Sequence, residues 1–162
     1  LHEHAARMER EAVAKIAEVA LGENTAHGSF FAPRAYELRS LDQLHREVFG
    51  PVLHVIRWKA DQLDAVIDAI NATGYGLTLG VHSRIDATIE KIASRIKVGN
   101  CYVNRNQIGA VVGVQPFGGQ GLSGTGPKAG GPHYLPRFAT EKTITVNTTA
   151  AGGNASLLTL GD

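Results

Sequence analysis

The sequence contains one cysteine, no long apolar run and almost no excess of charge, and each shortage excludes a class of protein. A single cysteine cannot form a disulfide within the chain and is typical of a reducing compartment, so we expect a cytoplasmic protein. The apolar stretches are too short to span a bilayer, and the first ten residues, LHEHAARMER, lack the features of a signal peptide. With a net charge of +1 and no basic run, we expect no contact with nucleic acid.

The seven histidines do not have the spacing of a metal site. His2 and His4 lie two residues apart in a predicted helix and therefore point to different faces. The others are scattered over the chain, and no cysteines accompany them as zinc ligands. No serine–histidine–aspartate order or nucleophile-elbow motif is visible either. We therefore expect no metal centre and no hydrolase triad.

The overall composition is typical of one globular domain, with 43% hydrophobic and 19% charged residues in a chain of 162. The chain begins with leucine in a helical pattern, so we expect a piece of a longer protein. Residues 1–20 predict a helix that ends at Gly22. Residues 29–38 predict a strand or strand pair, interrupted by Pro33 and therefore at a sheet edge. Ser40 can cap a short helix.

The middle of the chain has a regular alternation of strands and helices. Its elements are a strand at residues 52–58, a helix from Asp61 to Gly74, a strand at 77–82, a helix from Asp86 to Gly99 and a strand at 100–103. This order is typical of a parallel βαβαβ sheet with right-handed crossovers, so the predicted fold class is α/β. In such sheets ligands bind beyond the carboxyl ends of the strands.

Residues 104–134 form a long glycine-rich segment that begins at such a carboxyl end, with nine glycines between Gly109 and Gly131. So many helix and strand breakers predict a shaped loop, and its interspersed apolar residues favour an ordered wall of a site over disorder. Residues 119–124 match the dinucleotide fingerprint G-x-G-x-x-G, but the prolines that follow prevent the helix that this motif requires. We therefore do not interpret the motif as a nucleotide site.

Cys101 is the only candidate for a thiol nucleophile. It lies in a predicted buried strand, and no helix begins after it that could lower its pKa. A small buried hydrophobic residue is the better interpretation.

Two places in the sequence could bind a ligand. Glu47 and Phe49 precede the turn into the first regular strand, where they could accept hydrogen bonds from ribose hydroxyls and pack on a flat ring. The alternative is a surface glutamate beside a core phenylalanine. In the long loop, the N–H groups of Gly109 and Ala110 could bind a small anion, and Phe117 could line a pocket. The alternative there is a purely structural loop, and these residues alone leave both alternatives open.

Residues 137–147 predict a half-buried strand, because Ile144 and Val146 alternate with polar residues. The strand has no evident partner nearby in the chain. It is therefore a candidate for pairing with another subunit.

Several motifs in order resemble the C-terminal third of the aldehyde dehydrogenases. In chain order they are 47–52 (EVFGPV), 74–77 (GYGL), Gly99-Asn100, Val103-Asn104, 116–119 (PFGG) and Ser123-Gly124. The segments 106–113 (NQIGAVVG) and 126–132 (GPKAGGP) are more narrowly similar to the L-glutamate γ-semialdehyde (Δ1-pyrroline-5-carboxylate) dehydrogenases, above all to those fused to proline dehydrogenase in bacterial PutA proteins. The resemblance covers residues 28–147.

The resemblance implies a role for five residues. Glu47 would bind the ribose of the nicotinamide half of NAD, and Phe49 would pack near the nicotinamide. The backbone of Gly109 and Ala110 would anchor the α-carboxylate of L-glutamate γ-semialdehyde, and Phe117 would hold its aliphatic chain. The family's catalytic cysteine, oxyanion asparagine, general-base glutamate and Rossmann domain lie upstream of the matching region, so we expect no catalytic residue here and no activity from the isolated chain.

The resemblance also implies an organisation of the chain. Residues 1–139 would belong to the catalytic domain, 140–149 to an oligomerisation strand and 150–162 to a tail or linker. The upstream segments of the same chain would be its partners, residues 140–147 would build a homo-oligomer, and a fused proline dehydrogenase would bind FAD. The full-length parent could then associate peripherally with the inner membrane. An inactive structural module of the same family and a small free-standing α/β domain that binds an anionic metabolite are the alternatives.

Overall fold

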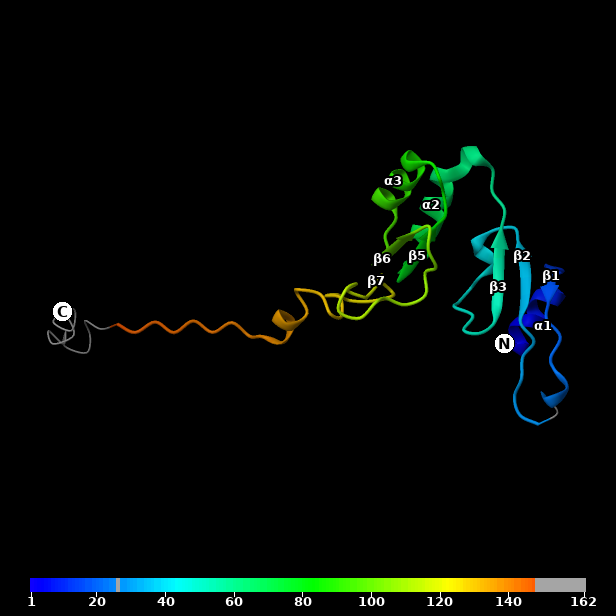
Figure 1. The fold of residues 1–162 in the computed structure, drawn as a ribbon, viewed down its shortest axis with the longest axis horizontal. Coiled ribbons are helices and arrows are strands. Elements are labelled where there is room, and N and C mark those ends of the chain that lie inside the picture. The colour runs from blue at the N-terminus through cyan, green and yellow to red at the C-terminus, as the bar shows by residue number, and fades with distance from the viewer. Residues whose placement is uncertain (26, 148–162) are drawn as a thin grey trace.

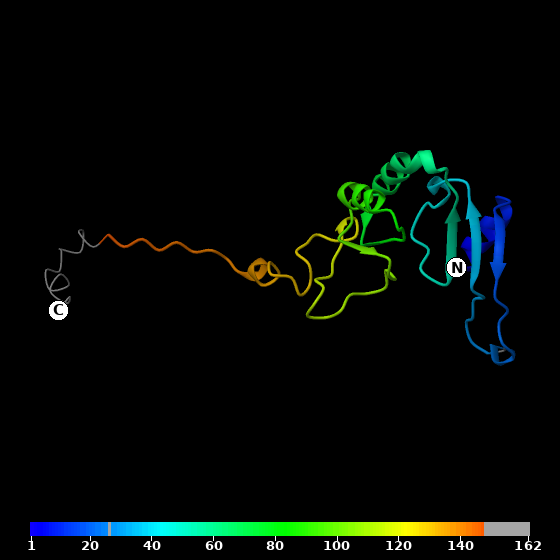
Figure 2. The same cartoon turned by 45° about the horizontal axis from the view of Figure 1, so that its top comes forward.

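The computed structural model describes residues 1–25 and 27–147, which form an α/β fold. Figures 1 and 2 show an N-terminal sheet with a helix beside it, a second group of helices and short strands, and a C-terminal arm that extends away from both. No helix within the described ranges has both the length and the apolar composition needed to cross a membrane.

The N-terminal sheet has the strand order β1-β2-β3 and packs against α1. Its elements are α1 (His2–Arg10), β1 (Ala14–Glu18), β2 (Arg34–Leu38) and β3 (Val52–Ile56). β1 pairs antiparallel with β2, and β2 pairs parallel with β3. Met8 of α1 is fully buried against Tyr36 and Leu38 of β2, so this contact is the hydrophobic core of the N-terminal half.

The predicted helix at residues 1–20 is wrong in its second half. The helix ends at Arg10, Ala12 adopts a left-handed φ of 51°, and the N–H of Val13 donates to the Met8 carbonyl at 2.9 Å. The residues that follow have helical composition, but β1 forms a ladder with β2 instead. Tertiary pairing thus overrides local helix propensity.

The predicted edge position of β2 is also wrong, because β2 is the middle strand of the sheet. The strand begins immediately after Pro33, so the proline does not have to donate to the ladder. Its carbonyl instead accepts a hydrogen bond from the N–H of Val19 at 2.8 Å. The helix predicted after Ser40 is only a 3-10 turn, Leu41–Gln43, and Ser40 makes no capping hydrogen bond.

The second group contains the crossover that the sequence predicts. Its elements are α2 (Leu63–Ala72), β4 (Tyr75–Gly76), β5 (Thr78–Val81), α3 (Asp86–Arg95), β6 (Asn100–Val103) and β7 (Gln120–Gly121). β5 and β6 are parallel and joined by α3, and β4 pairs antiparallel with β7 from the long loop. Ile67 of α2 is buried, and Lys91 of α3 bridges to Asp64 of α2 at 2.8 Å.

One continuous βαβαβ sheet is not formed in the described part of the chain. β3 pairs with β2 and β5 pairs with β6, and no ladder joins the two sheets. The alternation of strands and helices predicts the direction of a crossover, but it does not say which strands are neighbours. Asp61 does not cap α2 either, since it lies within the 3-10 turn Ala60–Gln62 that precedes the helix.

The C-terminal arm contains the 3-10 helix Leu135–Phe138, and the residues after it up to 147 form no strand. Ile144 and Val146 are each 73% exposed, so the prediction of a half-buried strand is wrong within this chain. Within the described residues the arm has no strand beside it that could cover its apolar side chains. The last two residues of the predicted oligomerisation strand (148 and 149) and the tail at 150–162 lie outside the described residues.

Candidate functional site

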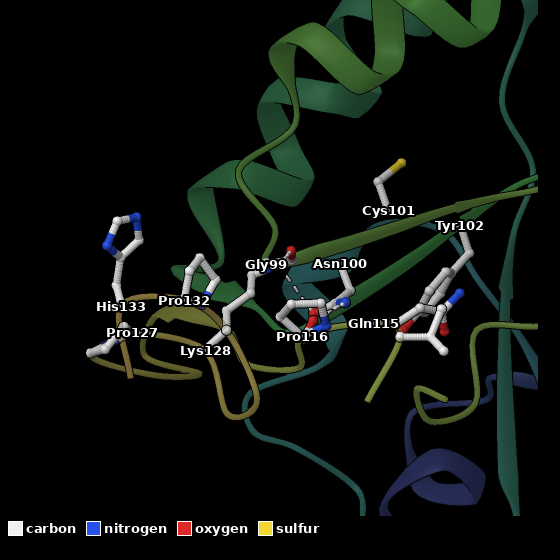
Figure 3. Close-up of a pocket in the computed structure, with 12 residues that line it drawn as sticks. Gly99, Asn100, Cys101, Tyr102, Gln115, Pro116, Pro127, Lys128, Pro132 and His133 are labelled. Carbon is white, nitrogen blue, oxygen red and sulfur yellow. Dashed lines mark hydrogen bonds between the residues drawn. The ribbon is translucent and has the colours of Figure 1, made fainter. Parts of the chain in front are cut away.

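The glycine-rich loop is held at the start of β6 by two side chains, Asn100 and Lys128 (Figure 3). Asn100 is only 8% exposed. Its Nδ2 donates to the Pro116 carbonyl at 3.0 Å, and its Oδ1 accepts from the N–H of Gly118 at 3.3 Å. Lys128 Nζ donates to the Gly99 carbonyl and lies 3.4 Å from the same Oδ1. A buried amide and an ammonium group therefore fix the loop to the sheet.

Glycine is required where the loop lies directly on the strand and on itself. A Cβ added to Gly99 would lie 1.7 Å from the Gly118 carbonyl oxygen, and one added to Gly119 would lie 2.5 Å from that of Ser123. No helix begins at residues 119–124, as the sequence predicts. The glycines of the apparent dinucleotide motif serve backbone packing instead.

Gly109 and Ala110 lie in a bend with free backbone donors. Gly109 has a φ of 64°, and its carbonyl accepts a hydrogen bond from the Tyr102 hydroxyl at 3.0 Å. In the part of the chain that the structure describes, neither the Gly109 nor the Ala110 N–H donates a hydrogen bond. Gln115 closes the far side of the bend, because its Oε1 accepts from the N–H of Val111 at 3.0 Å. Two adjacent unpaired N–H groups on a braced bend can bind an anion.

Phe117 has its backbone fixed on both sides. Its N–H donates to the Ala129 carbonyl at 3.0 Å, and its carbonyl accepts from the Ala129 N–H at 2.9 Å. The Phe117 side chain is half-buried. The bend at 109–110 and Phe117 thus belong to one loop with a defined geometry.

Glu47 and Phe49 lie in the segment that leads into β3. Glu47 is exposed and lines a cavity of about 950 Å³ together with residues of α2, β4 and the loop, among them Tyr75 and Ser123. Phe49 is 88% exposed, so the alternative of a core phenylalanine is wrong. Its exposed ring and the nearby carboxylate remain available for a ligand.

The structure does not bring the five candidate residues into one pocket. Glu47 lines the cavity beside α2, whereas the cavity of about 710 Å³ beneath the loop is lined by other residues, including Asn100, Cys101, Lys128 and His133 (Figure 3). The described residues therefore provide two separate surfaces and no enclosed reaction site.

Cys101 lines the cavity beneath the loop without the features of a nucleophile. It is half-buried on β6, and burial raises the pKa of its thiol. A raised pKa leaves less thiolate at neutral pH, which agrees with an unreactive structural cysteine.

Two histidines lie together in the structure although no spacing in the sequence indicates it. His4 of α1 and His54 of β3 approach with their Nε2 atoms 3.0 Å apart, and the Tyr36 ring stacks on His54. Burial lowers the pKa of both imidazoles, and Arg7 lowers both further through its charge. The two histidines are 50 positions apart in the sequence, and only the docking of α1 on the sheet brings them together. Among the described residues no group of three or more histidine, cysteine or acidic side chains could hold a metal ion.

Comparisons with known proteins identify the family. The sequence model described as "Aldehyde dehydrogenase family" matches residues 2–144, which is most of the chain. The chain belongs to the aldehyde dehydrogenase family. It is 60% identical over 130 residues to a bifunctional protein PutA of Rhizobium meliloti, covering 80% of this chain and 11% of that protein. It is 48% identical over 101 residues to a 1-pyrroline-5-carboxylate dehydrogenase of a Geobacillus species, covering 62% of this chain and 19% of that protein.

A solved structure of a similar protein has a similar fold. A crystal structure of Bradyrhizobium japonicum proline utilization A superimposes with a TM-score of 0.82 at 60% identity, covering 92% of this chain and 15% of that one. The chain thus spans between about a tenth and a fifth of the length of these relatives.

Proposed function

We propose that this chain is part of the catalytic region of an NAD-dependent dehydrogenase that oxidises L-glutamate γ-semialdehyde to L-glutamate in proline catabolism. The observation that carries the proposal is the pair of unpaired N–H groups at Gly109 and Ala110 on a braced loop. Similarity to PutA and to 1-pyrroline-5-carboxylate dehydrogenases supports the choice of substrate.

The loop recognises the substrate in this proposal. Its α-carboxylate accepts hydrogen bonds from the N–H groups of Gly109 and Ala110, which are already oriented and do not have to break other bonds. Phe117 packs against the aliphatic chain of the substrate. The aldehyde end then projects toward catalytic groups on segments of the same protein outside this chain.

The residues before β3 are suited to one end of NAD. When NAD is bound, its nicotinamide ring is the hydride acceptor. The exposed Glu47 carboxylate can accept hydrogen bonds from ribose hydroxyls, and the exposed Phe49 ring offers a flat apolar surface for a nicotinamide. In the same proposal FAD belongs to a fused proline dehydrogenase domain, and the exposed apolar side chains of residues 140–147 pair with another copy of the protein.

Replacing Ala110 by proline in the full-length enzyme tests substrate recognition, because the change removes one of the two donors. Loss of a hydrogen bond to a charged group corresponds to about a 10- to 100-fold rise in KM for L-glutamate γ-semialdehyde. Val112→Pro is the matched control, since Val112 is 97% exposed and lies within the turn closed by the Val114 N–H and the Val111 carbonyl. An unchanged KM in Ala110→Pro would contradict the proposed role of the bend.

Replacing Glu47 by alanine tests cofactor binding. We expect Glu47→Ala to raise the KM for NAD. The control Glu90→Ala removes an exposed carboxylate from α3 and should leave the KM for NAD unchanged. Equal KM values for NAD in both variants would refute the role of Glu47. The isolated chain, which lacks the catalytic groups in this proposal, is expected to give no aldehyde-dependent NADH signal.

A further inference from the structure

We propose that Asn100 is a positioning residue of the substrate pocket, which orients Phe117 by clamping the two peptide groups on either side of it. The inference rests on the proposed role of Phe117 in holding the substrate. It assigns the control of that side chain to a residue on the neighbouring strand, outside the loop.

The clamp has a simple geometry. The Asn100 side chain donates to the Pro116 carbonyl at 3.0 Å and accepts from the Gly118 N–H at 3.3 Å. Phe117 itself lies between these two groups, and its own N–H and carbonyl both pair with Ala129. All four backbone groups around the Phe117 side chain are therefore fixed, two of them by a single amide. A backbone held at four points leaves the ring only its own χ rotations.

Lys128 determines which way the amide faces. An ammonium group can only donate, so the Lys128 Nζ at 3.4 Å favours the Oδ1 of Asn100 on its side and directs Nδ2 toward Pro116. Lys128 also donates to the Gly99 carbonyl and precedes Ala129, the backbone partner of Phe117. The lysine thus links the strand, the amide and the segment that pairs with Phe117. Figure 3 shows its position beside Gly99 and Asn100.

Burial makes this arrangement specific to asparagine. Asn100 is only 8% exposed, so water does not readily replace a lost partner. Aspartate has nearly the same shape and can still accept from Gly118 and pair with Lys128, but it cannot donate to the Pro116 carbonyl. Asn100→Asp therefore frees the Pro116 carbonyl, one of the four held groups, and leaves the volume of the site nearly unchanged.

The test is a double-mutant cycle in the full-length enzyme with Asn100→Asp, Phe117→Ala and the double variant. We expect Asn100→Asp to raise KM for L-glutamate γ-semialdehyde about tenfold, with kcat within about twofold and KM for NAD unchanged. In the Phe117→Ala background, Asn100→Asp should have no further effect, because the ring that it positions is gone. A merely structural role would change KM for NAD and kcat as well.

The outcomes separate the two proposals. If Phe117→Ala raises KM for the aldehyde but Asn100→Asp does not, or if the two effects multiply, the positioning role is refuted and the proposed function stands. If Phe117→Ala itself has no effect, the proposed role of Phe117 fails and the positioning role with it. If Asn100→Asp does not fold, Lys128→Met, which keeps the apolar stem, should still raise KM for the aldehyde by a smaller factor. An unchanged KM in a folded Lys128→Met variant would overturn the inference.

Discussion

Gly99 offers a sharp test of how the loop is held on the sheet, because alanine at this position adds one methyl group and little else. The added Cβ would lie 1.7 Å from the Gly118 carbonyl oxygen, whereas real Cβ contacts are essentially never shorter than 3.0 Å. Strand and loop would therefore have to separate by about 1.3 Å, and the obstacle is backbone, which cannot rotate away as a side chain can.

The cost follows from the contacts that this separation breaks. Asn100 cannot keep its hydrogen bonds to both Pro116 and Gly118 when the loop moves by that distance. Two hydrogen bonds at about 1 kcal/mol each and an overpacking cost of about 1 kcal/mol give a loss of about 3 kcal/mol. The loss should appear as local opening of the loop, since the N-terminal sheet makes no ladder with this region.

Hydrogen–deuterium exchange in the full-length protein measures this opening. The amides of Phe117 and Ala129, which pair with each other, should exchange about 100-fold faster in Gly99→Ala if about 3 kcal/mol is lost. Gly22→Ala is the control, because its added Cβ meets nothing within 4 Å and its φ is ordinary, so exchange should not change. Unchanged protection of Phe117 and Ala129 in Gly99→Ala would refute the described docking of the loop.

Three further predictions concern Met8, the pair of histidines and Cys101. Met8→Ala should lower the free energy of unfolding by about 2–5 kcal/mol and Met8→Leu by less than about 1.5 kcal/mol, as measured by denaturation, because Met8 is fully buried. Folding lowers the pKa values of His4 and His54 because burial disfavours the charged imidazolium. The unfolded chain therefore binds more protons than the folded one, so the melting temperature should fall as the pH drops below about 6.5, and His54→Gln should flatten that dependence. A melting temperature as steeply pH-dependent in the variant as in the wild type would argue against the pair. Cys101 should react slowly with iodoacetamide at pH 7, because burial raises the pKa of its thiol. Cys101→Ala should leave the proposed dehydrogenase activity of the full-length protein unchanged, and a loss of turnover in a folded variant would contradict the structural interpretation.

The two separate surfaces of the site have a consequence for function. Glu47 and Phe49 lie before β3 of the N-terminal sheet, and the loop that carries Phe117 follows β6 of the β5-β6 sheet. The cavity that Glu47 helps to line has a volume of about 950 Å³. In the proposed enzyme, upstream segments of the same protein complete the space between cofactor and substrate, which agrees with the small share of its relatives that this chain spans.

The sequence by itself determined the elements whose signals are local. The apolar spacing on α2 and α3, the strand β3, the α3 crossover between β5 and β6, and the density of glycine and proline in the loop all act over a few residues, and the structure has them. The sequence also predicted that no helix begins at the G-x-G-x-x-G motif, because the prolines after it are incompatible with a helix in any fold. Recognition of the family depended on motifs of the same short range.

Only the tertiary structure decided how these elements combine. Residues 14–18 have a helical composition, yet pairing with β2 makes them a strand. β2 lies in the centre of its sheet because β1 and β3 each pair with one of its edges. The contact between His4 and His54 and the clamp of Asn100 around Phe117 join residues that are distant in the sequence or belong to different elements. No local pattern encodes such contacts, since they result from which surfaces bury each other when the chain folds.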